Sequence, residues 1–376
     1  MEVWNRNRGG IVKKLKILEL FGGIGACSKA LEKLRIEYEI SDYVEIDKYA
    51  VKSYNAMHDT NFEPQDICAW DKDIDVDLIM HGSPCQDFSL AGKQAGGDEG
   101  SGTRSSLMYE TIRIVEKLKP KYVIWENVKN VISKKHRHNF DNYLNKMEEL
   151  GYKNYWQVLN AKDYGIPQNR ERVFTISIRN DISIDFVFPE KQELKLKLKD
   201  ILEENVEEKY FLSEAMLNYM YGVNQKPSKF PRRERFEANI NRKNQDVANS
   251  VTTNAGNRPT DNFIKIKNAT KKGYLEATDG DGIDLAQPNS KTRRGRVQKE
   301  AIQTLTTQNN LGVVNSDLRI RKLSPKECWR LMGFDDEDFE KVEKVNSNTQ
   351  LYKQAGNSIV VNVLMAIFKE LLIEEV

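Results

Sequence analysis

The chain has 376 residues, of which 39% are hydrophobic and 30% are charged, and its formal net charge is +2 at pH 7. These values predict a soluble globular protein of one or two domains with enough apolar residues for a real core. They exclude a strongly basic chain, so any affinity for nucleic acid must come from local clusters of charge.

The cysteines and the apolar runs limit the cellular setting. The four cysteines stand far apart and form no CxxC pair, so neither a disulfide framework nor a cysteine-based metal site is expected. No apolar run approaches the roughly 20 residues that span a bilayer. Residues 1–16 lack the apolar core of a signal peptide. We therefore expect a cytoplasmic protein with no membrane association.

The first half of the chain alternates short apolar runs with amphipathic stretches, which is typical of βαβ units and a mostly parallel sheet. The expected strands are residues 16–20, 38–44, 76–81, 122–125 and 173–178. The expected helices are residues 26–34, 48–57, 105–118 and 139–150. This half of the chain is predicted to be a doubly wound α/β domain.

The middle of the chain, from residue 180 to about 316, is rich in Lys, Asn, Gln, Thr and Gly and has weak periodicity. It predicts a separate, loop-rich module. Two of its segments, 247–253 and 301–307, share a Thr-rich pattern. A repeated strand motif and a coincidence are equally good explanations, because short Thr-rich strands are common.

Two helices are expected near the C-terminus. Ser324 caps the first, Pro325 occupies its first turn, Glu327 completes a capping box and Gly333 ends it. The stretch 356–376 predicts an apolar amphipathic helix that packs back on the first domain.

A glycine-rich turn follows the first strand in the run Phe21-Gly22-Gly23-Ile24-Gly25. Such a turn lets backbone N–H groups approach a nucleotide-like ligand, although a tight βα turn without a ligand is the alternative. The order of glycines is not the dinucleotide GxGxxG. Glu45 ends the next strand, where it could bind ribose hydroxyls, and Asp66 is placed to bind an adenine amino group. Each alone is more often a solvated carboxylate.

Cys85 stands in a Pro84-Cys85 turn directly after an expected strand, at the edge where open α/β sheets place their active sites. A lone cysteine is more often a small buried hydrophobe. Here, however, the proline-fixed turn points the thiol out of the strand end. The glycine-rich segment 87–104 that follows resembles a lid.

Two further strands bring charged side chains toward the same edge. Residues 122–128 end in Glu126, Asn127 and Val128, so a carboxyl group is delivered at the strand end. Arg170 and Arg172 precede another strand, and their i, i+2 spacing sends both to one side if the segment is extended. A surface charge pair is the alternative explanation for the arginines.

Taken together, these motifs resemble the DNA cytosine-5 methyltransferase family. The resemblance covers residues 17–174 and 321–364. It rests on five motifs in the family's order: the glycine turn, Pro84-Cys85-Gln86, Glu126-Asn127-Val128, Gln168-x-Arg170-x-Arg172 and Gln354-Ala355-Gly356-Asn357-Ser358. One residue departs from the pattern, because Ile46 stands where the family often has an aromatic side chain against the adenine.

The resemblance implies a Rossmann-like domain that uses S-adenosyl-L-methionine and releases S-adenosyl-L-homocysteine, without a metal. Cys85 is implied as the nucleophile that adds to carbon 6 of a flipped-out cytosine. Glu126 would bind ring N3 and the exocyclic amine, and Arg172 would hold O2. Arg170 would support the charge of a phosphate or thiolate.

Residue by residue, the resemblance also implies a cofactor pocket and DNA contacts. The cofactor pocket is expected to contain Phe21, Gly23, Ile24, Gly25, Glu45, Ile46, Asp66, Ile67, Pro84, Leu107, Asn357 and Ser358. The DNA contacts are expected at Gln86, Ser89, Arg232, Arg233, Arg235, Arg293, Arg294 and Arg296, although solvated surface charge is the alternative for both arginine clusters.

The implied domains are a catalytic domain at 1–180 completed by 355–376, a target-recognition domain at 181–316, and hinge and connecting helices at 317–354. The expected partners are double-stranded DNA and, as a candidate, a cognate restriction endonuclease. A monomer is expected.

Three other functions were weighed. A tRNA-modifying relative on the same domain usually carries a Cys-Phe-Thr tripeptide in its middle region, and this sequence has none. A catalytically dead DNA-binding protein is disfavoured because the expected catalytic side chains are all present. Amino-directed methyltransferases use an Asp/Asn-Pro-Pro-aromatic turn, which is absent from the sequence.

Overall fold

The computed structural model describes residues 14–84, 107–213, 263–288, 290–308, 310–316 and 319–372. The chain divides into two compact units. The first consists of Met1–Ile201, Thr304–Asn309 and Ser324–Val376, and the second of Leu202–Gln303 and Asn310–Leu323. The helices from residue 325 to 357, expected as hinge and connecting helices, thus belong to the first unit.

A six-stranded sheet in the order β2-β1-β3-β4-β7-β5 forms the centre of the first unit. Strands β2, β1, β3 and β4 run parallel, whereas β7 is antiparallel to β4, and β5 is antiparallel to β7. The strands are β1 (Leu15–Leu20), β2 (Tyr38–Val44), β3 (Leu78–His81), β4 (Tyr122–Val128), β5 (Tyr152–Asn160) and β7 (Glu171–Arg179), and the two-residue β6 (Gln168–Asn169) precedes β7.

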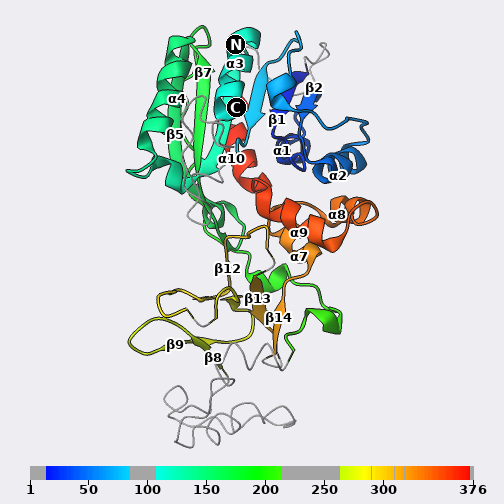
Figure 1. Cartoon of the computed structure of the whole chain (residues 1–376), viewed down its shortest axis with the longest axis vertical. Coiled ribbons are helices and arrows are strands. Elements are labelled where there is room, and N and C mark those ends of the chain that lie inside the picture. Colours follow the sequence, from blue (N-terminus) through cyan, green and yellow to red (C-terminus); the bar gives the residue numbers. More distant parts are fainter. Residues whose placement is uncertain are drawn as a thin grey trace, which may run out of the picture. The chain divides into compact units, whose positions relative to one another are not determined.

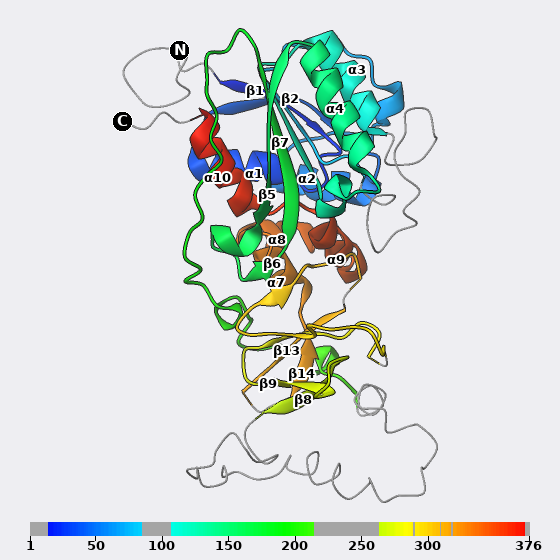
Figure 2. The same cartoon turned by 90° about the vertical axis from the view of Figure 1, so that its left-hand side faces the viewer.

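Helices cover both faces of this sheet (Figures 1 and 2), as the predicted doubly wound fold requires. Helices α3 and α4 share one apolar core with the strands, to which Leu18, Ile112 and Phe140 contribute. Helices α1 and α10 pack together on the other face. The helices of the unit are α1 (Ala26–Leu34), α2 (Lys48–His58), α3 (Met108–Leu118), α4 (Arg137–Glu149), α7 (Pro325–Arg330), α8 (Asp336–Val342), α9 (Asn348–Asn357) and α10 (Val361–Leu372).

The expected elements of the first unit are all present with small shifts of their ends, and the fold class is confirmed. Strand β5 was not expected. Its sequence, YKNYWQVLN, has no clear apolar alternation, because it is an edge strand and most of its side chains are at least partly exposed. The helix-covered parallel strands at the other end of the sheet do have the apolar periodicity by which strands are predicted.

Between the two helices expected near the C-terminus the structure has two more, α8 and α9, and the last helix begins later than expected. Helix α7 has the expected capping box, in which Ser324 and Glu327 each bind the other's backbone N–H. The helix expected from residue 356 instead begins at Val361, because α9 continues to Asn357 and the extended backbone of Ser358 interrupts the path. Packing back on the first domain is confirmed by the contact of α10 with α1.

The stretch Asn348–Leu372 is long and apolar enough to cross a membrane by length and composition alone. The expectation that no such stretch exists was therefore wrong. However, 67% of its most apolar window is buried inside the protein. Burial of this kind is typical of a core helix in a soluble fold, which explains the composition.

The second unit contains short antiparallel strands. A four-stranded sheet has the order β11-β10-β13-β14, and β8 pairs with β9 in a hairpin. Ile266, Ile283 and Val314 belong to its small apolar core. The strands are β8 (Ile264–Lys267), β9 (Tyr274–Ala277), β10 (Gly282–Asp284), β11 (Val297–Gln298), β12 (Ile302–Gln303), β13 (Leu311–Val314) and β14 (Ile320–Lys322). Of the two Thr-rich segments, 247–253 lies outside the described residues.

Candidate active site

Several expected site residues lie outside the described part of the chain. These are Cys85, Gln86, Ser89, Arg232, Arg233 and Arg235, together with the expected lid at 87–104. The described chain reaches Pro84, directly before the expected nucleophile. Gly82, Ser83 and Pro84 are therefore the described residues that lead into this turn.

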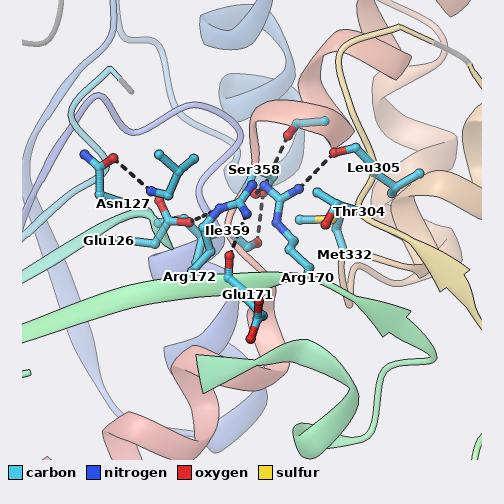
Figure 3. A network of polar contacts seen from close by, with 12 residues as sticks. Glu126, Asn127, Arg170, Glu171, Arg172, Thr304, Leu305, Met332, Ser358 and Ile359 are labelled. Atoms are coloured by element: carbon cyan, nitrogen blue, oxygen red, sulfur yellow. Dashed lines mark hydrogen bonds and ion pairs between the residues drawn. The ribbon is translucent and has the colours of Figure 1, made fainter. Parts of the chain in front are cut away.

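Glu126 and Arg172 form an ion pair at the C-terminal end of β4 (Figure 3). The distance from Arg172 Nε to Glu126 Oε1 is 3.0 Å. In the β4–β7 register Glu126 lies opposite Phe174, so Arg172, two residues earlier, is its diagonal neighbour on the same face of the sheet. The two side chains are 11% and 16% exposed, so the pair is largely shielded from water.

The environment of Glu126 raises the pKa of its carboxyl group above the ordinary value. The largest cause is burial, which disfavours the charged form, and the charges of Arg172 and Arg170 act in the opposite direction. A carboxyl group in this balance can hold a proton near neutral pH more readily than a surface glutamate. Such a group is suited to donating a hydrogen bond to a ring nitrogen.

Strand β4 also holds the residue two positions before Cys85. Trp125 donates its indole N–H to Ser83 Oγ at 2.9 Å, and the Asn127 amide donates to the Ser83 carbonyl at 3.4 Å. Ser83 is buried, with 3% of its surface exposed. No role is assigned to Asn127 or Trp125 from the sequence alone. A polar residue before Pro-Cys at a strand end is nevertheless a signal that a neighbouring strand supplies hydrogen-bond partners for it.

Gly82 lies beside the ion pair. A Cβ atom at this position would be 3.8 Å from Glu126 Oε2 and 3.7 Å from the Ile359 side chain. The end of β3, the end of β4 and the turn between α9 and α10 therefore meet within van der Waals reach. This is the C-terminal edge of the parallel strands, where ligands bind in open α/β sheets.

The glycine turn and Glu45 are brought together at the neighbouring strand ends. Glu45 Oε2 accepts the Gly23 N–H at 3.1 Å, and Oε1 accepts the Asp47 N–H at 2.8 Å. Phe21 and Gly23 both have positive φ, 52° and 56°. A phenylalanine in the left-handed region is uncommon, and such conformations cluster where a turn is shaped for a ligand.

The other expected cofactor residues differ in exposure. Ile46 is 69% exposed, whereas Ile24 and Ile67 are buried at 2% and 4%. Asp66 is exposed and accepts the Cys68 N–H at 3.0 Å. Leu107 is partly buried and packs on the same apolar core as Phe21. In the turn between α9 and α10, Asn357 is exposed and Ser358 is buried.

Arg170 and Arg172, whose spacing is expected to send both to one side, have different partners (Figure 3). Arg170 is 3% exposed, and its terminal nitrogens donate to the carbonyl oxygens of Leu305, Gly356 and Ser358. Its positive charge nevertheless acts on Glu126, where it opposes the rise in pKa that burial causes. The described contacts of its guanidinium are thus with backbone.

In the second arginine cluster, the side chain of Arg296 faces the interior of the protein. Arg296 is 2% exposed, and it donates to the carbonyl oxygens of Asp284, Ala286 and Gln287, so it stabilises the loop between β10 and β11 from within. Arg293 is partly exposed and forms an ion pair with Asp284, and Arg294 is exposed. Sequence alone does not separate these three arginines, because an Arg-rich run looks the same whichever member turns inward.

The sequence of the whole described range matches a known family. The model of the C-5 cytosine-specific DNA methylase family matches residues 15–372. The type II methyltransferase M2.ScrFI of Lactococcus lactis subsp. cremoris is 34% identical over 95% of this chain and 99% of its own. The orphan methyltransferase M.SPRI of Bacillus phage SPR is 35% identical, with 96% and 98% covered. The type II methyltransferase M.HhaI of Haemophilus parahaemolyticus is 33% identical, with 94% and 93% covered.

Solved structures agree at the level of the fold. The Spodoptera frugiperda DNMT2 mutant has a TM-score of 0.61 and 21% identity and covers 95% of this chain, with 99% of that chain covered. The S. pombe Dnmt2 methyltransferase has a TM-score of 0.58 and 18% identity, with 96% of this chain and 98% of that chain covered. The chain therefore belongs to the C-5 cytosine-specific DNA methylase family and is a DNA (cytosine-5) methyltransferase.

Proposed function

We propose that this enzyme transfers a methyl group from S-adenosylmethionine to carbon 5 of a flipped-out cytosine in a specific duplex DNA site, through a covalent Cys85 adduct. The observation that carries the proposal is the buried Glu126–Arg172 pair beside Gly82, three residues before Cys85. It operates either within a restriction–modification system or as an orphan enzyme, since the related proteins include both type II and orphan methyltransferases.

Covalent addition makes carbon 5 reactive. The Cys85 thiolate forms a bond to carbon 6, and the electron pair of the C5–C6 double bond moves toward carbon 5. Carbon 5 then takes the methyl group. Loss of the carbon 5 proton to a base and departure of the thiolate restore the double bond, so the cysteine is released unchanged.

Glu126 and Arg172 bind the ring during this addition. Protonated Glu126 donates to N3 and neutralises the charge that develops there, while its other oxygen accepts from the exocyclic amine. Arg172 keeps the carboxyl group aligned through the 3.0 Å contact and donates to O2. Both groups are largely buried, which strengthens these electrostatic contacts relative to water.

The glycine turn and Glu45 fit the cofactor. Among the described residues, a Cβ at Gly23 would meet only the Phe21 carbonyl, at 3.9 Å, so this part of the structure leaves the backbone there open to a close ligand. Glu45 is oriented by two backbone N–H groups, and its carboxylate oxygens retain lone pairs for ribose hydroxyls. Enzymes of this family use S-adenosylmethionine, which supplies an electrophilic methyl group when bound.

DNA binding requires the target base to leave the stack, at a cost of a few kcal/mol. The second unit, with exposed Arg294 and partly exposed Arg293, is proposed as the target-recognition domain and the source of phosphate contacts. A cognate restriction endonuclease stays a prediction.

Bisulfite sequencing of DNA from cells that express the chain tests the proposal. We expect protected cytosines in one short sequence, and none with Cys85→Ser, which should still bind S-adenosylhomocysteine. In parallel, duplex DNA and tRNA are offered with labelled S-adenosylmethionine. Label in tRNA alone, or substantial activity of Cys85→Ser, would contradict the proposal.

A further inference from the structure

Gln168 and Arg170 together bind both polar backbone groups of Leu305. The Gln168 Oε1 atom accepts the Leu305 N–H at 3.1 Å, and Arg170 Nη1 donates to the Leu305 carbonyl at 3.0 Å. Gln168 also donates to the Leu331 carbonyl at 2.8 Å and is fully buried. A buried arginine with this set of neighbours is fixed at several points, since its planar guanidinium donates in fixed directions.

The other arm of Arg170 binds the turn between α9 and α10. Its Nη2 atom donates to the Gly356 carbonyl at 3.1 Å and to the Ser358 carbonyl at 2.7 Å. Charge-assisted hydrogen bonds of this kind are stronger than neutral ones. One guanidinium thus joins the strand that carries Arg172, the segment 304–307 and the backbone from the end of α9 to Ser358 (Figure 3).

Gly356 permits this arrangement by its lack of a side chain. A Cβ atom at Gly356 would overlap the backbone of Thr306 and lie 2.6 Å from Thr307 N. Thr304 Oγ1 adds a hydrogen bond to the Asn169 carbonyl at 2.8 Å. The backbone of the 304–307 segment therefore packs directly against the last turn of α9.

We infer that Arg170 is a positioning residue that, with Gln168 and Gly356, holds the 304–307 segment and the Ser358 turn against the strand bearing Arg172. Through these contacts it sets the geometry of the Glu126–Arg172 pair and of the C-terminal side of the cofactor site. The inference rests on the proposed function for the identity of the cofactor. This positioning role differs from a contact with a phosphate or a thiolate, in which the guanidinium nitrogens of Arg170 would bind the substrate or Cys85.

The first test compares Arg170→Lys with Arg330→Lys in the full chain. Lysine keeps the charge but cannot donate from two separate nitrogens to opposite sides. Arg330 is the matched control, because it holds the Ile201 carbonyl and Asp336 in the same unit at a different place. We expect Arg170→Lys to weaken S-adenosylhomocysteine binding by about tenfold, as loss of one charge-assisted hydrogen bond implies, and to lower kcat on unmethylated plasmid DNA. Arg330→Lys should lower Tm without either effect.

A second variant, Gly356→Ala, leaves Arg170 intact and pushes the 304–307 backbone away. Gly356→Ala should show the same loss of cofactor affinity and of kcat as Arg170→Lys. It tests the inference by itself if Arg170→Lys does not fold. The salt dependence of the DNA KM separates the alternatives, since loss of one phosphate contact lowers the log–log slope by about one.

The inference is overturned if Arg170→Lys behaves kinetically like Arg330→Lys, or if Gly356→Ala binds S-adenosylhomocysteine normally. It is also overturned if Arg170→Gln lowers only the salt slope and leaves cofactor affinity unchanged. A failure of the proposed function is distinguishable, because the wild-type enzyme itself would then leave cytosine in plasmid DNA unmethylated.

Discussion

Glu126 and Arg172 are diagonal neighbours on antiparallel strands β4 and β7, with Arg172 Nε 3.0 Å from Glu126 Oε1. The pair depends on the switch from parallel to antiparallel strands at β4. An antiparallel partner presents the start of β7 to the end of β4, so an arginine that begins one strand meets a carboxyl group that ends the other.

Replacing Glu126 with Gln should lower kcat for DNA methylation by about 10²- to 10⁴-fold, the usual contribution of a general acid–base group. The amide keeps the size of the side chain but cannot transfer a proton. Single-turnover transfer of labelled methyl groups measures the effect. Glu171→Gln, at an exposed pair with Lys129, is the control. A variant within threefold of wild type would remove Glu126 from the mechanism.

The alkaline side of the pH–rate profile should report Glu126. Burial raises the pKa of this carboxyl group. In the proposed mechanism the protonated form is the active one, so activity should fall as the pH rises through that pKa. Arg172→Met removes the nearest positive charge, which raises the pKa further and moves this fall to higher pH while lowering the rate. An unmoved profile in Arg172→Met would assign the fall to another group.

Ile46→Trp should increase affinity for S-adenosylhomocysteine several-fold, since an aromatic contact contributes about 0.5–1.5 kcal/mol beyond its area. Ile46 is 69% exposed and follows Glu45, so a larger ring can be accommodated without repacking a core. Isothermal titration calorimetry gives the affinity. Val187→Trp, at another side chain that is 72% exposed, should leave it unchanged. Equal effects of the two variants would argue against an adenine site beside Ile46.

Glu19 should make the stability of the protein depend on pH. Its carboxyl group is buried beside Ser28 and Tyr54, and burial raises its pKa to about 7. Between pH 4.5 and 7 the folded state holds a proton that the unfolded state has released, so the free energy of unfolding falls as pH rises and levels off above 7.

Glu19→Gln should therefore be more stable than wild type at pH 8, by up to about 3 kcal/mol at 1.36 kcal/mol per pKa unit, and similar to it at pH 4.5. Denaturant unfolding at both values measures the difference. Glu39→Gln, at an exposed side chain, is the control and should keep the pH dependence of the wild type, because Glu19 is intact. The same pH dependence in Glu19→Gln and wild type would locate the effect elsewhere.

The arginines of the second unit should separate into two kinds. Arg296→Met removes one hydrogen bond from each of three backbone carbonyls, of which that of Gln287 keeps the Ser290 N–H, and should destabilise the protein by about 2–4 kcal/mol, at roughly 1 kcal/mol or more for each lost bond. Arg294→Ala should keep Tm and reduce the salt dependence of DNA binding. Thermal melts and DNA titrations at several salt concentrations check both. If Arg296→Met were as stable as the wild type but bound DNA weakly, Arg296 would be a DNA contact rather than a structural residue.

The local elements were predictable from the sequence because their signals are local. Apolar periodicity placed β1, α1 and β2, and the capping box at Ser324 and Glu327 placed the start of α7. The edge strand β5 and the break at Ser358 were missed. Most side chains of β5 are at least partly exposed on both faces of the sheet, so no contrast between a buried and an exposed face imposes alternation on its sequence. The break is fixed by the partners of the Gly356 and Ser358 carbonyls.

The sequence by itself determined the family's motifs, the sheet edge at which Glu126 ends its strand, and the glycine turn next to Glu45. Only the tertiary structure decided which partners each arginine has. Arg170, Arg172, Arg294 and Arg296 have the same chemistry, and they differ in which carbonyls or carboxylates lie within hydrogen-bond distance. Those partners come from residues more than a hundred positions away for Arg170, and for Arg172 from the neighbouring strand β4. The pattern along the chain therefore indicates where the site lies, whereas contacts across the fold show which partners each of its side chains has.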